Sequence, residues 1–258
     1  MIQIHTDEEI EILRENNLLV SKTLGELARW IRPGVTTNKL DKIAFEFICD
    51  NDAKPGFLGY NGYPKTLCTS VNDQVVHGIP SDYQLKEGDI ISIDCGVLKN
   101  KYYGDTAFTF AVGDINEEKK RLLEVTKQSL YLGIEKACEG ARVGDIGYAV
   151  QTFCESNGFS VVRELVGHGL GKGLHESPEV PNYGRRGKGT KLSTGMVICI
   201  EPMINMGRKE IVQESDGWTI RTSDRKPSAH FELAIAIRRG EADILSTFEF
   251  IEETNNNK

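Results

Sequence analysis

Asp89-Ile-Ile-Ser-Ile-Asp94-Cys-Gly96 is the stretch of sequence that decides the fold, together with Lys101-Tyr-Tyr-Gly-Asp105-Thr-Ala-Phe-Thr-Phe110 just after it. Both runs are rich in β-branched, aromatic and apolar residues, so they predict two adjacent strands. With residues 99 and 100 as a two-residue turn, Asp94 and Asp105 lie directly opposite each other on one face of a hairpin. Two carboxylates in that position repel each other, and a divalent cation between them reverses the sign of the effect.

The helical segments of the chain repeat after a shift of 106 residues. Thr6-Asp-Glu-Glu9 is a capping box that begins one helix, and a second amphipathic helix follows Thr37. The shifted copies are a helix capped by Asn116 and a next helix with apolar residues in matching positions, and Gly140 stands where Gly34 stood. This pattern predicts one domain over residues 1–258, made of two related helix–helix–strand halves, approximately 6–112 and 113–251.

The carboxylates follow the same repeat. The shift takes Asp94 to within one residue of Glu201, which ends the buried-strand run that begins at Met196. Asp216-Gly217 is a strong hairpin signal, and a meander centred on it brings Glu201 level with Glu232. Acidic groups of both halves are therefore expected to meet in a shared middle. The low-complexity tail, residues 252–258, is expected to be frayed.

Four carboxylates and one imidazole form the candidate metal site. Such a set suits two divalent ions, because four negative side chains balance four positive charges. Oxygen ligands with one nitrogen favour Mn, Fe(II), Co or Zn, and they make a pure Ca or Mg site unfavourable. A carboxylate on a sheet more often faces solvent, but three of these five stand inside apolar strands, where an unpaired charge is costly. The five residues are Asp94, Asp105, His168, Glu201 and Glu232.

Glycines surround two further histidines. His168 and His175 bracket Gly167-His-Gly-Leu-Gly-Lys-Gly-Leu-His175, where glycines at alternate positions let the backbone approach a ligand closely. A flexible surface loop is the alternative. His77 and His175 are expected to be polar groups beside the metals, whereas His5 and His230 are expected to be ordinary structural histidines.

The composition of the whole chain excludes several classes of protein. A net charge of −7 over 258 residues argues against a general nucleic-acid surface and against binding to anionic membranes. There is no apolar run long enough for a transmembrane helix, and the acidic N-terminus is not a signal peptide. The six cysteines are widely spaced without a Cys-x-x-Cys pair, which predicts reduced thiols and a cytoplasmic location.

Taken together, the segments resemble the type I methionine aminopeptidases of the M24 metallopeptidase class. The resemblance implies the pita-bread fold, which is an α+β fold with two pseudo-symmetric halves around a curved antiparallel sheet and helices on the outer face. It covers nearly the whole chain, and the matching stretches are 72–80, 88–94, 104–107, 167–171, 174–176, 195–202, 216–218 and 230–232.

The resemblance also implies a role for each candidate ligand. Asp94 would bind the second metal, and His168 and Glu201 would bind the first. Asp105 and Glu232 would bridge both ions. A bridging hydroxide would attack the scissile carbonyl, with Glu201 as the proton shuttle.

The same resemblance implies the residues that bind the substrate. His77 would hydrogen-bond around the scissile amide, and His175 would hold its carbonyl oxygen as negative charge develops. This chain has Phe57 and Leu174 where relatives often carry Cys and Phe, so we expect a retained preference for methionine with an altered fit of inhibitors. The implied methionine pocket consists of Tyr60, Tyr63, Cys68, His77 and Trp218.

The implied function is removal of the initiator methionine from nascent cytosolic proteins whose second residue is small and uncharged. The implied protein is a monomer whose catalytic body makes any transient contact with the ribosome. Two alternatives stay open. One is a peptidase like the X-Pro dipeptidases, which usually add a large N-terminal domain. The other is a non-catalytic pita-bread module that binds protein or RNA, although such modules have typically lost metal ligands that are all present here.

Overall fold

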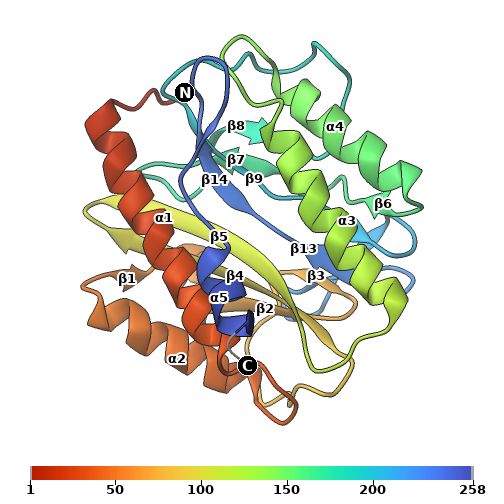
Figure 1. Cartoon of the computed structure of the whole chain (residues 1–258). Helices are drawn as coiled ribbons and strands as arrows, with labels where there is room; N and C mark the ends of the chain where they lie inside the picture. The colour runs from red at the N-terminus through yellow and green to blue at the C-terminus, as the bar shows by residue number, and fades with distance from the viewer. Residues whose placement is uncertain (1, 257–258) are drawn as a thin grey trace.

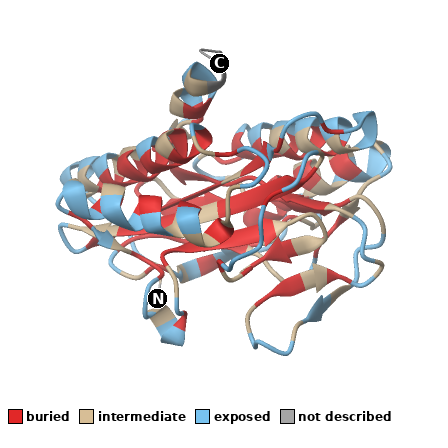
Figure 2. Ribbon diagram, turned by 90° about the horizontal axis from the view of Figure 1, so that it is seen from below, coloured by how far each residue is buried: buried red, intermediate tan, exposed pale blue. Residues whose placement is uncertain are grey.

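Helices cover one side of a layer of strands in the computed structural model, which describes residues 2–256 (Figure 1). Buried residues concentrate in the strands and on the helix faces that contact them (Figure 2). The five α-helices are α1 (Asp7–Ala28), α2 (Thr37–Asp50), α3 (Glu117–Ile134), α4 (Val143–Ser156) and α5 (Glu249–Asn256), and η1 (Tyr60–Gly62) is a 3-10 turn. None of the helices in this part of the chain is long and apolar enough to cross a membrane.

The strands pair in an antiparallel manner throughout. The first half contains β1 (Lys54–Pro55), β2 (Leu67–Val71), β3 (Gln74–Val76), β4 (Ile90–Lys99) and β5 (Tyr102–Ala111). The second half contains β6 (Ser160–Val161), β7 (Gly167–Gly169), β8 (Glu176–Val180), β9 (Val197–Ile200), β10 (Met203–Asn205), β11 (Ile211–Gln213), β12 (Ile220–Thr222), β13 (Ser228–His230), β14 (Leu233–Ala236) and β15 (Asp243–Ile244). The predicted α+β class is confirmed.

The predicted repeat is present in the backbone. Helices α2 and α4 begin and end 106 residues apart. Gly34 and Gly140 precede them with almost the same left-handed φ, 89° and 91°. Asn51 and Asn157 close the two helices, and each side-chain amide donates to the carbonyl four residues earlier. The shift becomes 107 residues at the strands, because β4 begins at Ile90 and β9 at Val197.

The predicted register of the first hairpin is wrong by two residues. Asp94 pairs with Ala107, and Asp105 pairs with Gly96. The turn consists of Asn100 and Lys101, which both have positive φ as a type I′ turn requires. Because the error is an even number, the two aspartates still share one face, but they are diagonal neighbours.

The predicted register of the second hairpin is confirmed. Ile200 pairs with Leu233, Met203 with His230, and Gln213 with Ile220, all in the meander centred on Asp216-Gly217. This meander between β9 and β14, called the long arm below, returns the chain to the first half.

Hydrogen bonds join the halves at this point. The Glu232 backbone N–H donates to the Ala107 carbonyl at 2.9 Å, and the Thr109 hydroxyl on β5 donates to the His230 carbonyl at 2.7 Å. The segment that carries Glu232 is therefore held beside β5, which carries Asp105.

The expected frayed tail is mostly helical, which corrects that prediction. Helix α5 includes residues 249–256, and Ile251 in it is fully buried. Glu252 pairs with Lys127 on α3, and the helix packs so tightly on α1 that a Cβ at Gly25 would lie 2.7 Å from the Phe250 Cβ. Apolar side chains before the polar tail thus anchor the helix. The last two residues of the tail lie outside the described residues.

Candidate metal centre and substrate cavity

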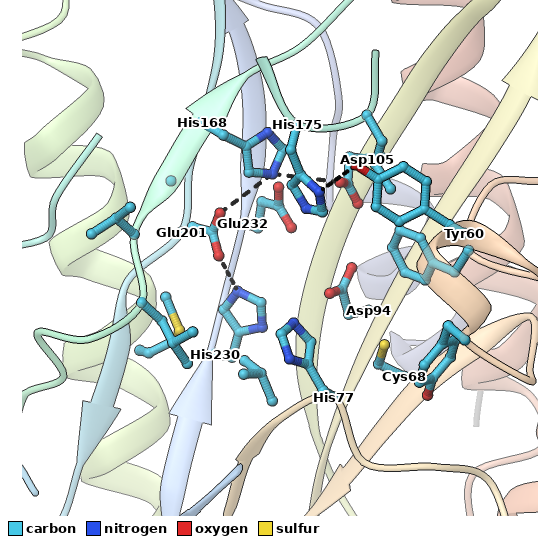
Figure 3. Close-up of a pocket in the computed structure, with 18 of the residues that line it drawn as sticks. Tyr60, Cys68, His77, Asp94, Asp105, His168, His175, Glu201, His230 and Glu232 are labelled. Atoms are coloured by element: carbon cyan, nitrogen blue, oxygen red, sulfur yellow. Dashed lines mark hydrogen bonds and ion pairs between the residues drawn. The ribbon is translucent and has the colours of Figure 1, made fainter. Parts of the chain in front are cut away.

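One cavity of about 560 Å³ brings together every residue that the sequence analysis predicted for the site. Its walls come from both halves, and the side chains point toward one another (Figure 3). The predicted residues in its lining are Tyr60, Tyr63, Cys68, His77, Asp94, Asp105, His168, His175, Glu201, Trp218 and Glu232.

Strands of both halves carry the candidate metal ligands. Nε2 of His168 on β7 lies 3.8 Å from Oδ2 of Asp105 on β5 and 3.5 Å from Oε1 of Glu201, just after β9. Candidate ligand atoms of Asp105, His168, Glu232 and Cys199 lie within 4.8 Å of one another. Asp105 is fixed in place by α1, because its backbone N–H donates to the buried side chain of Asn17 at 3.0 Å.

Unpaired oxygen atoms show that this centre fits a divalent cation. Oδ1 of Asp94, Oδ1 of Asp105 and Oε1 of Glu232 are buried without a hydrogen-bond partner in residues 2–256. Burial raises the pKa of Asp94 to about 6. Burial and the neighbouring carboxylates raise the pKa values of Asp105 and Glu232 well above their ordinary range. A divalent ion satisfies such oxygens and offsets their mutual repulsion.

His168 presents the nitrogen that a metal needs. Its Nδ1 lies 3.0 Å from the Gly169 carbonyl oxygen, which can only accept, so Nδ1 carries the hydrogen and Nε2 keeps its lone pair. Burial lowers the pKa of His168 to about 3, and the imidazole is therefore neutral at physiological pH. The lone pair faces Asp105 and Glu201.

His77 and His175 flank the carboxylates. His77 has a left-handed backbone with φ of 59°, an uncommon conformation for a non-glycine residue that clusters at functional sites. Burial lowers its pKa to about 4. His175 lies at the exposed mouth of the cavity, with its Nδ1 3.0 Å from the Tyr60 hydroxyl and its ring centroid 4.5 Å from that of His168. Both are placed as neutral hydrogen-bonding groups beside the centre.

An apolar pocket adjoins the carboxylates. Tyr63 and Trp218 meet edge to face with ring centroids 5.1 Å apart, and Phe57 and Leu174 are buried in the same hydrophobic cluster. Cys68 on β2 pairs directly with Asp94 on β4. The apolar pocket and the acidic centre are thus neighbours on one sheet.

Two residues of the site were missed by the sequence analysis. His230 was expected to be structural, yet it is buried in the cavity wall with its Nε2 3.6 Å from Oε2 of Glu201. Cys199 was counted only among the reduced thiols, yet its sulfur is within the ligand group. The missed signal is the two-residue period of a strand, since His230 stands two positions before Glu232 and Cys199 two before Glu201. His5 does not line the cavity, as expected.

Comparisons with known proteins agree with this geometry. Metallopeptidase family M24 matches residues 11–239. A methionine aminopeptidase of Clostridium perfringens is 49% identical over 246 residues, which are 95% of this chain and 99% of that protein. Methionine aminopeptidase 1 of Bacillus subtilis is also 49% identical over 246 residues, with the same shares of the two chains.

The fold also agrees with solved structures. The crystal structure of methionine aminopeptidase from Rickettsia prowazekii superposes with a TM-score of 0.94 at 42% identity, and the match covers 96% of this chain and 100% of that one. An Xaa-Pro dipeptidase from Bacillus anthracis shares the fold alone, with a TM-score of 0.75 at 19% identity and 62% of its own chain covered. The predicted pita-bread fold and the predicted resemblance are confirmed, and the chain belongs to metallopeptidase family M24.

Proposed function

We propose that the protein is a metal-dependent aminopeptidase that removes the N-terminal methionine from nascent polypeptides, preferentially when the second residue is small and uncharged. One observation carries the proposal: an apolar, aromatic pocket and a buried acidic centre share one cavity. A thioether packs well against aromatic rings. With the methionine side chain in the apolar pocket, the peptide bond that follows the methionine reaches the carboxylates. The names of the relatives at 49% identity support the same substrate.

The centre suits two divalent ions, for which Co, Mn, Fe(II) and Zn all satisfy the ligand set. Asp94 would help to hold one ion, His168 and Glu201 would help to hold the other, and Asp105 and Glu232 would contribute carboxylates to the shared centre. Such ions lower the pKa of bound water enough to supply hydroxide near neutral pH. The diagonal placement of Asp94 and Asp105 keeps both carboxylates on one face of the sheet, where they could hold cations together.

The protein side chains supply binding, orientation and proton transfer. The pocket around Tyr63 and Trp218 binds the methionine side chain. His77 and His175 donate hydrogen bonds to the scissile amide, and His175 holds the carbonyl oxygen as charge develops on it. Glu201 takes the proton of the attacking water and passes it to the leaving amine.

The proposed partners follow from this activity. The substrate is the N-terminus of a nascent chain, so we propose that the protein acts in the cytoplasm and contacts the ribosome only transiently. We also propose that it is a monomer. Its net charge of −7 disfavours stable binding to nucleic acid or to anionic membranes.

A pair of tripeptides tests the proposal. Protein loaded with Co or Mn is expected to hydrolyse Met-Ala-Ser and to leave Ala-Ala-Ser nearly untouched, because alanine leaves the apolar pocket unfilled. Release of the free amino acid measures both rates. Equal rates on the two peptides would show that the pocket does not select methionine.

Two further measurements address the alternatives. Faster cleavage of Ala-Pro than of Met-Pro would favour an activity like that of the X-Pro dipeptidases, with which only the fold is shared. The absence of metal binding in calorimetric titration would instead favour a non-catalytic module. We expect Met-Pro to be the better of the two dipeptides and both metal sites to fill.

A further inference from the structure

The two carboxylate oxygens of Glu201 face different groups. Oε1 lies 3.5 Å from Nε2 of His168, on the side of the candidate metal ligands. Oε2 lies 3.6 Å from Nε2 of His230 on the other side, as Figure 3 shows. The backbone is held separately, because the buried amide of Asn182 donates to the Glu201 carbonyl at 2.9 Å. With the backbone fixed, the side-chain partners decide how the carboxylate is rotated.

The backbone of His230 is held by hydrogen bonds, whereas its ring nitrogens are not. The Thr109 hydroxyl accepts from the His230 N–H at 2.9 Å and donates to its carbonyl at 2.7 Å, and Ser92 holds Thr109 at 2.8 Å. His230 is only 1% exposed, yet neither nitrogen of its ring has a hydrogen-bond partner within residues 2–256. A buried polar group without a partner is costly, which points to a bond that forms in the working site.

We propose that His230 is a positioning residue for Glu201, whose Oε2 it holds through an Nε2–H hydrogen bond so that Oε1 alone faces the metal ligands. The inference rests on the proposed function and assigns a role that the five candidate ligands do not cover. A shift of a few tenths of an ångström brings the 3.6 Å separation into hydrogen-bond range. Glu201 then keeps one oxygen for the proton of the attacking water.

The geometry separates this role from that of a metal ligand. Within the same cavity, the Glu201 carboxylate lies between His230 and His168, so the two rings contact different oxygens of Glu201 (Figure 3). His230 ends β13 two residues before Glu232, and the side chains of both residues line the same cavity.

Two amide substitutions test the inference, because they differ in reach. In His230→Gln the side-chain amide reaches the position of Nε2, whereas in His230→Asn it stops near Nδ1. Partners that orient a metal ligand are typically worth about 10- to 100-fold in activity. We expect His230→Asn to lower kcat on Met-Ala-Ser by that factor with KM changed less than about twofold, and His230→Gln to stay within about fivefold of the wild type.

Matched measurements exclude a merely structural effect. Ser246→Ala removes a buried hydrogen bond to Ala234 on the neighbouring strand and is expected to leave kcat unchanged. Calorimetric titration is expected to give the same number of bound ions for wild type, His230→Asn and His230→Gln. Equal kcat values for the Asn and Gln variants, or the loss of one bound ion from both, would overturn the inference while the wild type still cleaves the peptide. A wild type that does not cleave Met-Ala-Ser would overturn the proposed function and the inference with it.

Discussion

The two halves of the molecule share a scaffold but differ in what they bring to the cavity. Helices α2 and α4 match residue for residue after the shift of 106, whereas the strands that follow diverge. In the first half a two-residue turn joins β4 and β5, which carry Asp94 and Asp105. In the second half a long arm separates β9 from β14 and brings Trp218 to the pocket on its way back.

This difference teaches where the chemistry is encoded. The first half supplies two short aspartates, and the second supplies two glutamates and His168. Neither half holds all five candidate ligands, so the proposed site exists only where the halves meet. The helices preserve the symmetry, and the strand connections break it.

The largest expected effect comes from removing one ligand of either half. Asp105→Ala and Glu201→Ala should each lower kcat/KM by about 10³-fold or more, the upper scale on which one charge-stabilising group acts. Each deletion leaves the other carboxylates buried beside an incomplete centre. Assays in metal-defined buffer, with bound metal measured on the same samples, check both variants.

Glu241 is exposed and does not line the cavity, so Glu241→Ala is expected to keep wild-type activity and offers a control for that experiment. Retained turnover in Glu201→Ala would remove this residue from the mechanism. A large loss in only one of the two ligand variants would show that one half suffices.

Carboxyl groups of both halves should release protons when metal binds. Burial holds the pKa of Asp94 near 6 and raises that of Glu201 well above its ordinary value, so the metal-free protein retains carboxyl protons near neutral pH. His168 has a pKa of about 3 and has no proton to give. Metal displaces the protons, and its apparent affinity should therefore weaken about tenfold per pH unit for each proton as pH falls. Titration calorimetry in buffers of different ionisation heat measures the release; a pH-independent affinity between pH 6 and 8 would contradict it.

A smaller effect is expected at the apolar end of the cavity. Trp218 packs edge to face on Tyr63, and its loss removes one wall of the pocket. Trp218→Ala should raise KM for Met-Ala-Ser about tenfold, as for the loss of one to two apolar contacts. The chain's other tryptophan, Trp30, packs on the core outside the cavity, so Trp30→Ala should lower the unfolding temperature and leave KM unchanged. The same change in KM for both variants would mean that Trp218 acts only through stability.

Local patterns made the repeat and the long meander predictable. Capping residues and turn glycines act within a few residues, and the Asp216-Gly217 turn sets the register that places Glu201 level with Glu232. The same reasoning failed for Asp94 and Asp105, because both Asn100 and Lys101 accept positive φ and move the turn by one position. A lysine in that conformation carries no strong sequence signal.

His230 was missed for a different reason. A lone histidine on a strand is most often structural, and its role depends on which groups another segment brings to the same face. Glu201 and Thr109, the two residues that its ring and backbone contact, come from β-strand segments far away in sequence. Tertiary contacts of that kind are not visible in a local pattern, whereas the candidate metal ligands stood out in the sequence because carboxylates inside apolar strands are anomalous by themselves.

The smallest expected effect tests the scaffold alone. Gly34 and Gly140 occupy equivalent turns with φ near 90°, and a Cβ added at either would meet no atom within 4 Å. Alanine at each position should therefore cost only the strain of the left-handed backbone, about 1–2 kcal/mol. Gly34→Ala and Gly140→Ala should lower the free energy of unfolding equally in urea titrations and leave kcat/KM untouched. A difference between them larger than about 1 kcal/mol, the strain cost itself, would show that the halves are no longer equivalent even in the helical layer, where the sequence repeat is strongest.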